Sequence, residues 1–175
     1  VILSVQPKWC ELIASGKKTI EVRKSAPKEV PFKAYIYMTA TKERCRFWEY
    51  ITAYQNNKGD ILNGSQKVIG EFVCDRVEKY EADERGWYVY PRDDTCLWAH
   101  EIASYGKGKP LYGWHISDLK IYDKPRELGE FKTPDKPYHK IIERNGRLMF
   151  MDGYESGKPL KRAPQGWQYV EEIEG

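Results

Sequence analysis

The pattern of apolar and polar positions predicts a chain of short strands with few helices. Strands are expected where apolar residues form short runs or alternate with polar residues, which occurs at residues 2–5, 19–23, 33–39, 67–77 and 112–122. After the first of these, apolar residues recur at helical spacing, so a helix is expected to begin at Pro7 and to end at Gly16. Short strands with frequent turns favour an α+β fold, built as a partly closed mixed barrel with flanking helices.

The remaining segments are assigned by the same rules. Helical spacing predicts helices over residues 41–54 and 95–105, and the polar, glycine-bearing stretch 55–66 is expected to be a loop. A short helix is expected over residues 125–131. Near the C-terminus, the turn dipeptide in KIIERNGRLMFM predicts a hairpin over residues 140–151, which we expect to pack on the main sheet.

Two positions indicate irregular backbone within the strands. Gly70 lies inside the most strongly predicted strand, which suggests a β-bulge or a close approach of another group to the backbone. The alternation also breaks near Ser117 and Asp118, which indicates a second bulge. Glu71 is an acid within an otherwise apolar strand, so it needs a partner or a solvent-facing position.

Residues 14–24, ASGKKTIEVRK, are the segment on which the functional hypotheses rest. Gly16 suits the position after a helix, where a left-handed backbone favours glycine. In the strand that follows, Thr19, Glu21 and Arg23 share one face, and the two apolar residues between them share the other. That face is either part of a ligand site or a solvated edge strand with ordinary ion pairs, and these residues alone leave both interpretations open.

Composition narrows the class of protein only moderately. The 175 residues suit one domain, and 31% charged and 41% hydrophobic residues are ordinary for a globular chain. A net charge of +3 permits a nucleic-acid partner without arguing for one. No apolar run is long enough to span a membrane and no signal-peptide pattern opens the chain, so we expect a cytoplasmic protein without membrane contact.

The four cysteines are widely separated, at positions 10, 45, 74 and 96. They form no CxxC pair, and neither their spacing nor the nearby histidines support a zinc site, so buried reduced thiols are favoured over disulfides or zinc. We therefore expect neither a metal site nor a cofactor.

The order of these motifs resembles the ASCH domain family, which belongs to the PUA-like β-barrel superfamily. The resemblance rests on GKKTIEVR, KVIGEFVCDRV and YGWHISDLKIYDKP, and its most specific part is the pattern Gly16, Lys18, Glu21 and Arg23. It covers roughly residues 1–125, and the closing KRAPQGWQYVEE is similar to the ending of phage and prophage members. We therefore expect a single domain over 1–175, with a core to about residue 125 and an extension over 126–175.

The resemblance implies a cleft beside the first helix that binds RNA or a modified nucleoside. Some small family members are amidohydrolases with a lysine, a threonine nucleophile and a glutamate, and ribonuclease activity is also attributed to the family. Lys18 matches the lysine and Glu71 the glutamate, but Glu21 occupies the nucleophile position and has no hydroxyl with which to form an acyl intermediate. Thr19 lies two residues earlier, roughly 6–7 Å away along the strand.

The resulting hypothesis is that RNA or a modified nucleotide binds in a cleft around GKKTIEVR. The predicted binding residues are Lys17, Lys18, Glu21, Arg23, Tyr37, Glu71 and Trp114, with the two aromatic rings as stacking surfaces. If the chain is an enzyme, Lys18, Glu21 and Glu71 are the predicted catalytic residues of a hydrolase acting on a modified nucleoside or RNA. A third hypothesis is a phage accessory protein whose surface binds another protein.

Overall fold

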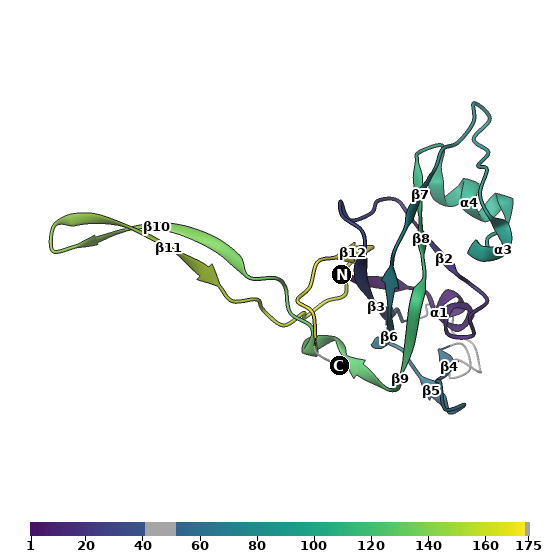
Figure 1. The fold of residues 1–175 in the computed structure, drawn as a ribbon, viewed down its shortest axis with the longest axis horizontal. Coiled ribbons are helices and arrows are strands. Elements are labelled where there is room, and N and C mark those ends of the chain that lie inside the picture. The colour runs from purple at the N-terminus through teal and green to yellow at the C-terminus, as the bar shows by residue number, and fades with distance from the viewer. Residues whose placement is uncertain (41–51, 174–175) are drawn as a thin grey trace.

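The computed structural model describes residues 1–40 and 52–173, and the elements below are those of this part of the chain (Figure 1). The helices are α1 (Pro7–Ala14), α3 (Arg92–Thr95), α4 (Ala99–Gly106) and the 3-10 turn η1 (Leu128–Glu130). The strands of the first half are β1 (Ile2–Val5), β2 (Ile20–Arg23), β3 (Phe32–Met38), β4 (Ala53–Gln55), β5 (Ile61–Asn63), β6 (Lys67–Cys74) and β7 (Val77–Tyr80). The later strands are β8 (Leu111–His115), β9 (Ser117–Glu127), β10 (Lys136–Arg144), β11 (Arg147–Glu155) and β12 (Trp167–Gln168).

The central sheet is mixed, with the strand order β12-β1-β3-β6-β9. Strands β1 and β3 are parallel, and the other neighbours are antiparallel. The C-terminal strand β12 pairs with β1, so Ile2 lies opposite Gln168. The extension predicted over residues 126–175 thus contributes a strand to the same sheet as the N-terminus.

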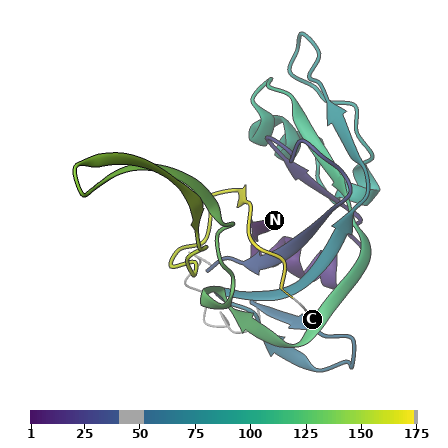
Figure 2. The same cartoon turned by 60° about the vertical axis from the view of Figure 1, so that its left-hand side comes forward.

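A second, antiparallel sheet has the order β2-β8-β7. The chain passes from β8 directly into β9 of the central sheet, and Figures 1 and 2 show this second sheet rising from the first, with α3 and α4 beside it. The mostly β, α+β class is confirmed. In the described residues the two sheets are not hydrogen-bonded into one closed ring, so the predicted barrel is not confirmed.

Each face of the central sheet has its own hydrophobic core. On one face, α1 contributes Cys10 and Ile13 to a cluster with Ile36, Phe72 and Trp114. The other face is covered by the C-terminal part of the chain. This second cluster comprises Ile2, Tyr35, Tyr37, Val68, Tyr122, Phe131 and Leu160.

The two predicted irregularities lie in the strands β6 and β9. The β6–β9 register shifts between Val68 and Gly70, and a Cβ on Gly70 would lie 2.5 Å from the carbonyl oxygen of Lys120. Gly70 therefore combines the bulge with the close backbone approach that the sequence predicted. Asp118 has a φ of 48°, beside a second register shift between Glu71 and Val73.

Several predicted segments differ from the structure. Residues 55–66 are not simply a loop, because β4 and β5 form a hairpin there. The helix predicted over 41–54 lies mostly outside the described residues, and its last positions belong to β4. The helix predicted over 95–105 begins at Ala99 instead, since Cys96 has a left-handed φ of 53° that ends α3. The helix predicted over 125–131 is only the turn η1, because β9 continues to Glu127.

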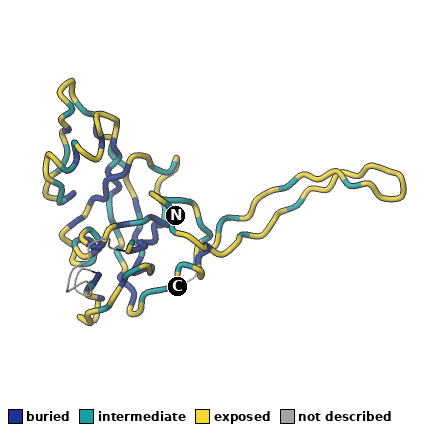
Figure 3. Tube along the Cα trace, turned by 180° about the vertical axis from the view of Figure 1, so that it is seen from behind, coloured by how far each residue is buried: buried dark blue, intermediate teal, exposed yellow. Residues whose placement is uncertain are grey.

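The C-terminal hairpin forms as predicted around Asn145 and Gly146, which both have positive φ. Its position was predicted wrongly, since Figures 1 and 2 show β10 and β11 projecting from the body of the protein as an arm. Figure 3 shows that this arm is exposed over most of its length. The apolar residues in RLMFM suggested core packing, but Leu148 and Phe150 are 70% and 80% exposed.

Candidate functional site

The candidate site is a cavity of about 790 Å³ between the end of β1, the start of α1, β2 and the α4 region. Its polar lining comes mainly from β2 and the turn before it, and its aromatic lining from Trp9 and Tyr105. The lining includes Ser4, Lys8, Trp9, Lys18, Glu21, Arg23, Thr39, Glu101 and Tyr105.

The local backbone brings Lys18 into this wall. Helix α1 ends at Ala14, and Gly16 adopts the left-handed φ of 72° that was predicted for it. The Lys18 N–H then donates to the Leu12 carbonyl at 2.9 Å, which folds the turn back on the helix. Thr19 is tied to α3 through two bonds to Asp94, one from its N–H and one from its hydroxyl.

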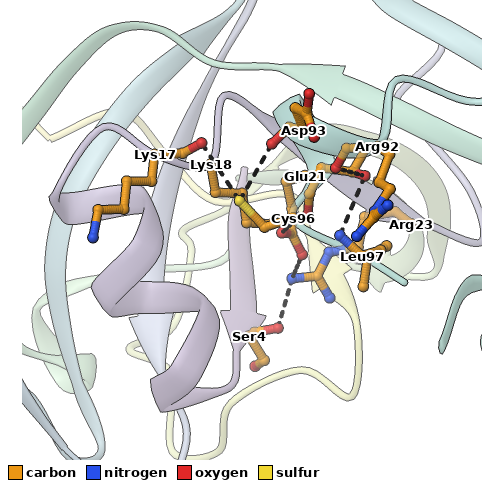
Figure 4. Close-up of polar contacts among 10 residues, drawn as sticks. Ser4, Lys17, Lys18, Glu21, Arg23, Arg92, Asp93, Cys96 and Leu97 are labelled. Atoms are coloured by element: carbon orange, nitrogen blue, oxygen red, sulfur yellow. Dashed lines mark hydrogen bonds and ion pairs between the residues drawn. The ribbon is translucent and has the colours of Figure 1, made fainter. Parts of the chain in front are cut away.

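Lys18, Glu21 and Arg23 form one buried ionic cluster, with side chains pointing toward one another in Figure 4. The Glu21 carboxylate lies between the two cations: one oxygen is 3.4 Å from Lys18 Nζ and the other 2.9 Å from an Arg23 terminal nitrogen. The three residues are only 2%, 5% and 8% exposed. The interpretation of this segment as a solvated edge strand is therefore wrong.

Backbone carbonyls complete the cluster. Lys18 Nζ donates to the Thr95 carbonyl at 2.6 Å, and Arg23 donates to the Ser4 carbonyl at 2.7 Å. The Lys18 ammonium also lies 5.2 Å from the centre of the Trp9 ring, within cation–π range. Helix α1, strand β1 and α3 thus all supply contacts that fix these two cations.

The cluster leaves positive charge unneutralised at the cavity wall. One carboxylate faces two cations, and burial lowers the pKa of Lys18 while the adjacent Glu21 opposes that shift. Among the described residues, the buried Arg23 Nε has no hydrogen-bond partner. An unsatisfied buried donor costs about 1–3 kcal/mol, so the cluster would gain from one further acceptor at this N–H.

The rim of the cavity is electrically balanced and aromatic. Lys8 and Glu101 pair at 3.0 Å across the opening between α1 and α4. Tyr105 is 37% exposed, and partial burial raises the pKa of its hydroxyl. The Lys24 ammonium lies 4.8 Å from the centre of the Tyr105 ring. Lys8 Nζ likewise lies 4.2 Å from the centre of the Trp9 ring, so both aromatic rings of the lining have a lysine over one face.

Of the predicted binding residues, the structure brings Lys18, Glu21 and Arg23 together at the cavity, and Lys17 is an exposed neighbour. The other three lie elsewhere. Glu71 accepts a 2.6 Å hydrogen bond from the Tyr122 hydroxyl. Tyr37 is buried in the cluster on the opposite face of the central sheet, so it is no stacking surface in this cavity.

Trp114 is also a core residue. It lies opposite Glu21 in the β2–β8 pair, but it is 0% exposed and packs edge-on against Phe32 and Trp167. Sequence reasoning instead missed Trp9 and Tyr105 as lining residues. The signal for Trp9 was its place in the first turn of α1, on the helix that flanks the predicted cleft.

Three further features of the described chain concern metal ligands, thiols and membrane-spanning helices. In residues 1–40 and 52–173, no three His, Cys, Asp or Glu side chains come together as a metal site requires. Three cysteines of this part, Cys10, Cys74 and Cys96, are free thiols. No helix within the described ranges has the length and apolar character needed to cross a membrane.

Comparison with known proteins identifies the family. The crystal structure of ASCH from Zymomonas mobilis has a TM-score of 0.47 at 18% identity, covering 73% of this chain and 72% of that one. A tyrosine-to-phenylalanine mutant of the Zymomonas mobilis protein has a TM-score of 0.48 at 19% identity, covering 73% and 74%. No curated protein matches the chain. The family model for the ASCH domain matches residues 3–107, which is more than half of the sequence, and the chain therefore belongs to the ASCH domain family.

Proposed function

We propose that this protein binds RNA or a modified nucleotide in the cavity around Lys18, Glu21 and Arg23. The observation that carries the proposal is the buried cluster with more cations than carboxylates and an unpartnered Arg23 N–H. A volume of about 790 Å³ lies within the range of roughly 300–1,000 Å³ typical of small-ligand pockets. ASCH domains are generally RNA-binding, and RNA is an anionic ligand rich in hydrogen-bond acceptors, as this cluster of donors favours.

The cavity offers three kinds of contact to a nucleotide. Arg23 and Lys18 provide charge-assisted donors to a phosphate or to carbonyl oxygens of a base. Glu21 accepts hydrogen bonds from amino or ring N–H groups. The rings of Trp9 and Tyr105 provide stacking surfaces at the opening, and stacking is worth about 1–3 kcal/mol per base.

A second candidate is hydrolysis of a modified nucleoside or RNA in the same cavity. It is favoured by Lys18, which lies 3.4 Å from the Glu21 carboxylate and whose pKa is lowered by burial, as suits a proton-transferring group. The threonine route of the amidohydrolase members lacks support, because Thr19 is exposed, is not among the residues that line the cavity, and donates its hydroxyl to Asp94 on α3. Binding is the better supported function, since it requires no nucleophile.

The proposal is tested by titrating the full chain with the four ribonucleoside 5′-monophosphates and with a labelled RNA oligonucleotide of mixed sequence. Arg23→Gln is expected to weaken binding about tenfold or more, because hydrogen bonds to charged groups are worth about 1.5–3 kcal/mol. Lys28→Gln removes one exposed cation outside the cavity and serves as the control. Equal affinities of Arg23→Gln and wild type would overturn the proposal, provided circular dichroism shows both folded.

The hydrolase candidate needs a separate measurement. Product formation from acylated cytidine and from RNA is followed by chromatography with wild type, Lys18→Met and Glu21→Gln. Turnover lost in both variants, with folding intact, favours the enzyme. Ligand binding by wild type without turnover favours the binding module.

A further inference from the structure

The arm formed by β10 and β11 has two chemically different faces. Side chains alternate along each strand, and the cross-strand partners Arg144 and Arg147 share a face. The first face, here called the basic face, carries Lys136, Tyr138, Lys140, Ile142, Arg144, Arg147, Met149, Met151, Gly153 and Glu155. The second, the apolar face, carries Pro137, His139, Ile141, Glu143, Leu148, Phe150, Asp152 and Tyr154.

Charge is sorted between these faces. All four lysine and arginine residues of the arm lie on the basic face, at positions 136, 140, 144 and 147. The one carboxylate there, Glu155, is paired with Lys158 at 2.6 Å. The apolar face holds Glu143 and Asp152, and the latter is bonded to His139 at 2.7 Å. In the described part of the chain, none of the four basic-face cations is in an ion pair, so their charge is available to a partner.

Two contacts within the basic face position Tyr138 and Lys140. Tyr138 lies across Gly153, where an added Cβ would be 2.8 Å from the tyrosine ring. Lys140 Nζ is held 4.7 Å from the centre of that ring. Two arginines flank the tip, and the cations along β10 are four residues apart, or about 13 Å at strand spacing. The four cations therefore lie in one row, about 26 Å long, that follows the arm.

We propose that the arm binds a nucleic-acid duplex by laying its basic face on the phosphates that border a groove. The proposal extends the proposed function, because it adds a second contact surface for the same class of ligand. A row of unpaired cations complements the repeating phosphates of a duplex backbone, to which positively charged side chains contribute salt-dependent affinity. A single strand is bound instead on exposed aromatic platforms, whereas the aromatic residue of this face lies under Lys140.

A protein partner on the apolar face is less well supported. The exposed apolar side chains of this face run from Leu148 to Tyr154, a strip about 20 Å long and 10 Å wide at the spacing of two strands. That is about 200 Å², compared with the roughly 800 Å² per partner of a standard protein interface. The strip alone is too narrow to hold a second copy of the chain.

The test uses fluorescence anisotropy of the full chain with a double-stranded RNA, a double-stranded DNA of the same sequence and a single-stranded RNA. One variant replaces the four basic-face cations by glutamine (K136Q, K140Q, R144Q and R147Q). The control replaces four exposed cations elsewhere, K107Q, K109Q, K161Q and R162Q, so that both proteins lose the same charge. A second control, I141T with F150T, changes only the apolar face.

The basic-face variant is expected to bind the duplexes at least tenfold more weakly. Because each phosphate contact contributes about −0.9 to the slope of log affinity against log salt, this slope should flatten by about three to four units. Both controls should keep the wild-type affinity and slope. The RNA and DNA arms of the experiment show which duplex is preferred, and binding of either through these four residues supports the proposal.

Three results would overturn the proposal. The first is an equal loss of duplex affinity in the basic-face variant and in the charge-matched control, and the second is tighter binding of the single-stranded RNA through the same four residues. The third is self-association of the chain that I141T with F150T abolishes, while the basic-face variant binds duplexes normally. The cavity is assayed independently with nucleoside monophosphates. If the basic-face variant loses duplex binding but keeps mononucleotide binding, the effect lies in the arm. If Arg23→Gln loses mononucleotide binding but keeps duplex binding, the effect lies in the cavity.

Discussion

Replacing Glu21 by glutamine is the sharpest perturbation of the ionic cluster. The substitution keeps the shape of the side chain and removes its charge. Lys18 and Arg23 then stay buried, 2% and 8% exposed, without the carboxylate that lies 3.4 Å and 2.9 Å from them. We therefore expect Glu21→Gln to fold but to be clearly less stable than wild type.

The magnitude follows from the burial of the charges. Removing one partner of a buried ion pair costs about 3–5 kcal/mol, because the remaining charge has lost both water and its counterion. Here the backbone carbonyls of Thr95 and Ser4 still accept hydrogen bonds from the two cations. We therefore place the loss of unfolding free energy at the lower end of this range, at about 3 kcal/mol.

The assay is urea unfolding followed by tryptophan fluorescence, with the double variant Lys18→Met and Glu21→Gln as the matched control. The double variant removes one of the two orphaned charges, so it should recover at least about 1 kcal/mol relative to Glu21→Gln alone. An unfolding free energy of Glu21→Gln within about 0.5 kcal/mol of the wild-type value would refute the reasoning. The same conclusion follows if the double variant is no more stable than the single one.

The pH dependence of the unfolding free energy gives a second, independent test of the same substitution. Burial lowers the pKa of Lys18 from its ordinary value of 10.5, and Glu21 opposes that shift, so Glu21→Gln lowers the pKa further. A lysine with a lower pKa in the folded state binds fewer protons there than in the unfolded chain. The unfolding free energy therefore rises as the pH increases from the folded-state pKa toward 10.5, and it rises more in the variant. The deficit of Glu21→Gln should shrink as the pH is raised from 7 to 10.

Two further predictions concern packing and burial. Gly70→Ala places a Cβ 2.5 Å from the Lys120 carbonyl oxygen, so it should lower the unfolding free energy by about 1–3 kcal/mol, whereas Gly129→Ala, with nothing within 4 Å, should leave the melting temperature nearly unchanged. Equal effects of the two substitutions would contradict the close approach in β6. Burial raises the pKa of the Cys74 thiol to about 11, so iodoacetamide at pH 8 should modify the half-exposed Cys96 before Cys74. Mass spectrometry of timed samples checks the order, and faster labelling of Cys74 would be inconsistent with its burial.

The elements that the sequence predicted well are those whose signals are local. The left-handed glycine after α1 and the turn at Asn145 and Gly146 depend on φ preferences of single residues, and both occur where predicted. Gly70 was informative because a glycine inside an apolar strand has few explanations, and the structure combines two of them. Local chemistry was therefore sufficient for these positions.

The parts that failed depend on contacts between distant segments. Sequence alternation places Glu21 and Trp114 on definite strand faces, but only the pairing of β2 with β8 and the packing of Trp167 decide that Trp114 is core. Glu71 needed a partner, and that partner, Tyr122, lies 51 residues away on β9. Nothing local to Tyr105 indicated that α4 would bring its ring to the cavity.

The same reasoning explains why the arm was misplaced. An apolar run such as LMFM normally indicates burial, because its residues gain from leaving water. In β11, however, alternation sends these side chains to both faces of a two-stranded ribbon, and a ribbon without a third layer leaves both faces exposed. Only the tertiary position of the hairpin reveals that no other part of the described chain covers it.

The cavity and the arm are separable parts of one molecule, which makes their proposed roles independent. Apart from Gln165, the residues that line the cavity lie within residues 3–107, which match the ASCH domain, whereas the arm occupies residues 136–155. The arm is closed at its base, where the Gly157 N–H donates to Asp135 at 2.7 Å, and the chain then returns to supply β12 beside β1. Substitutions on the exposed arm therefore leave the central sheet and its two cores intact. A nucleic-acid ligand contacted at both places would show two additive losses of affinity, one from Arg23→Gln and one from the basic-face variant, because residues without shared partners act independently.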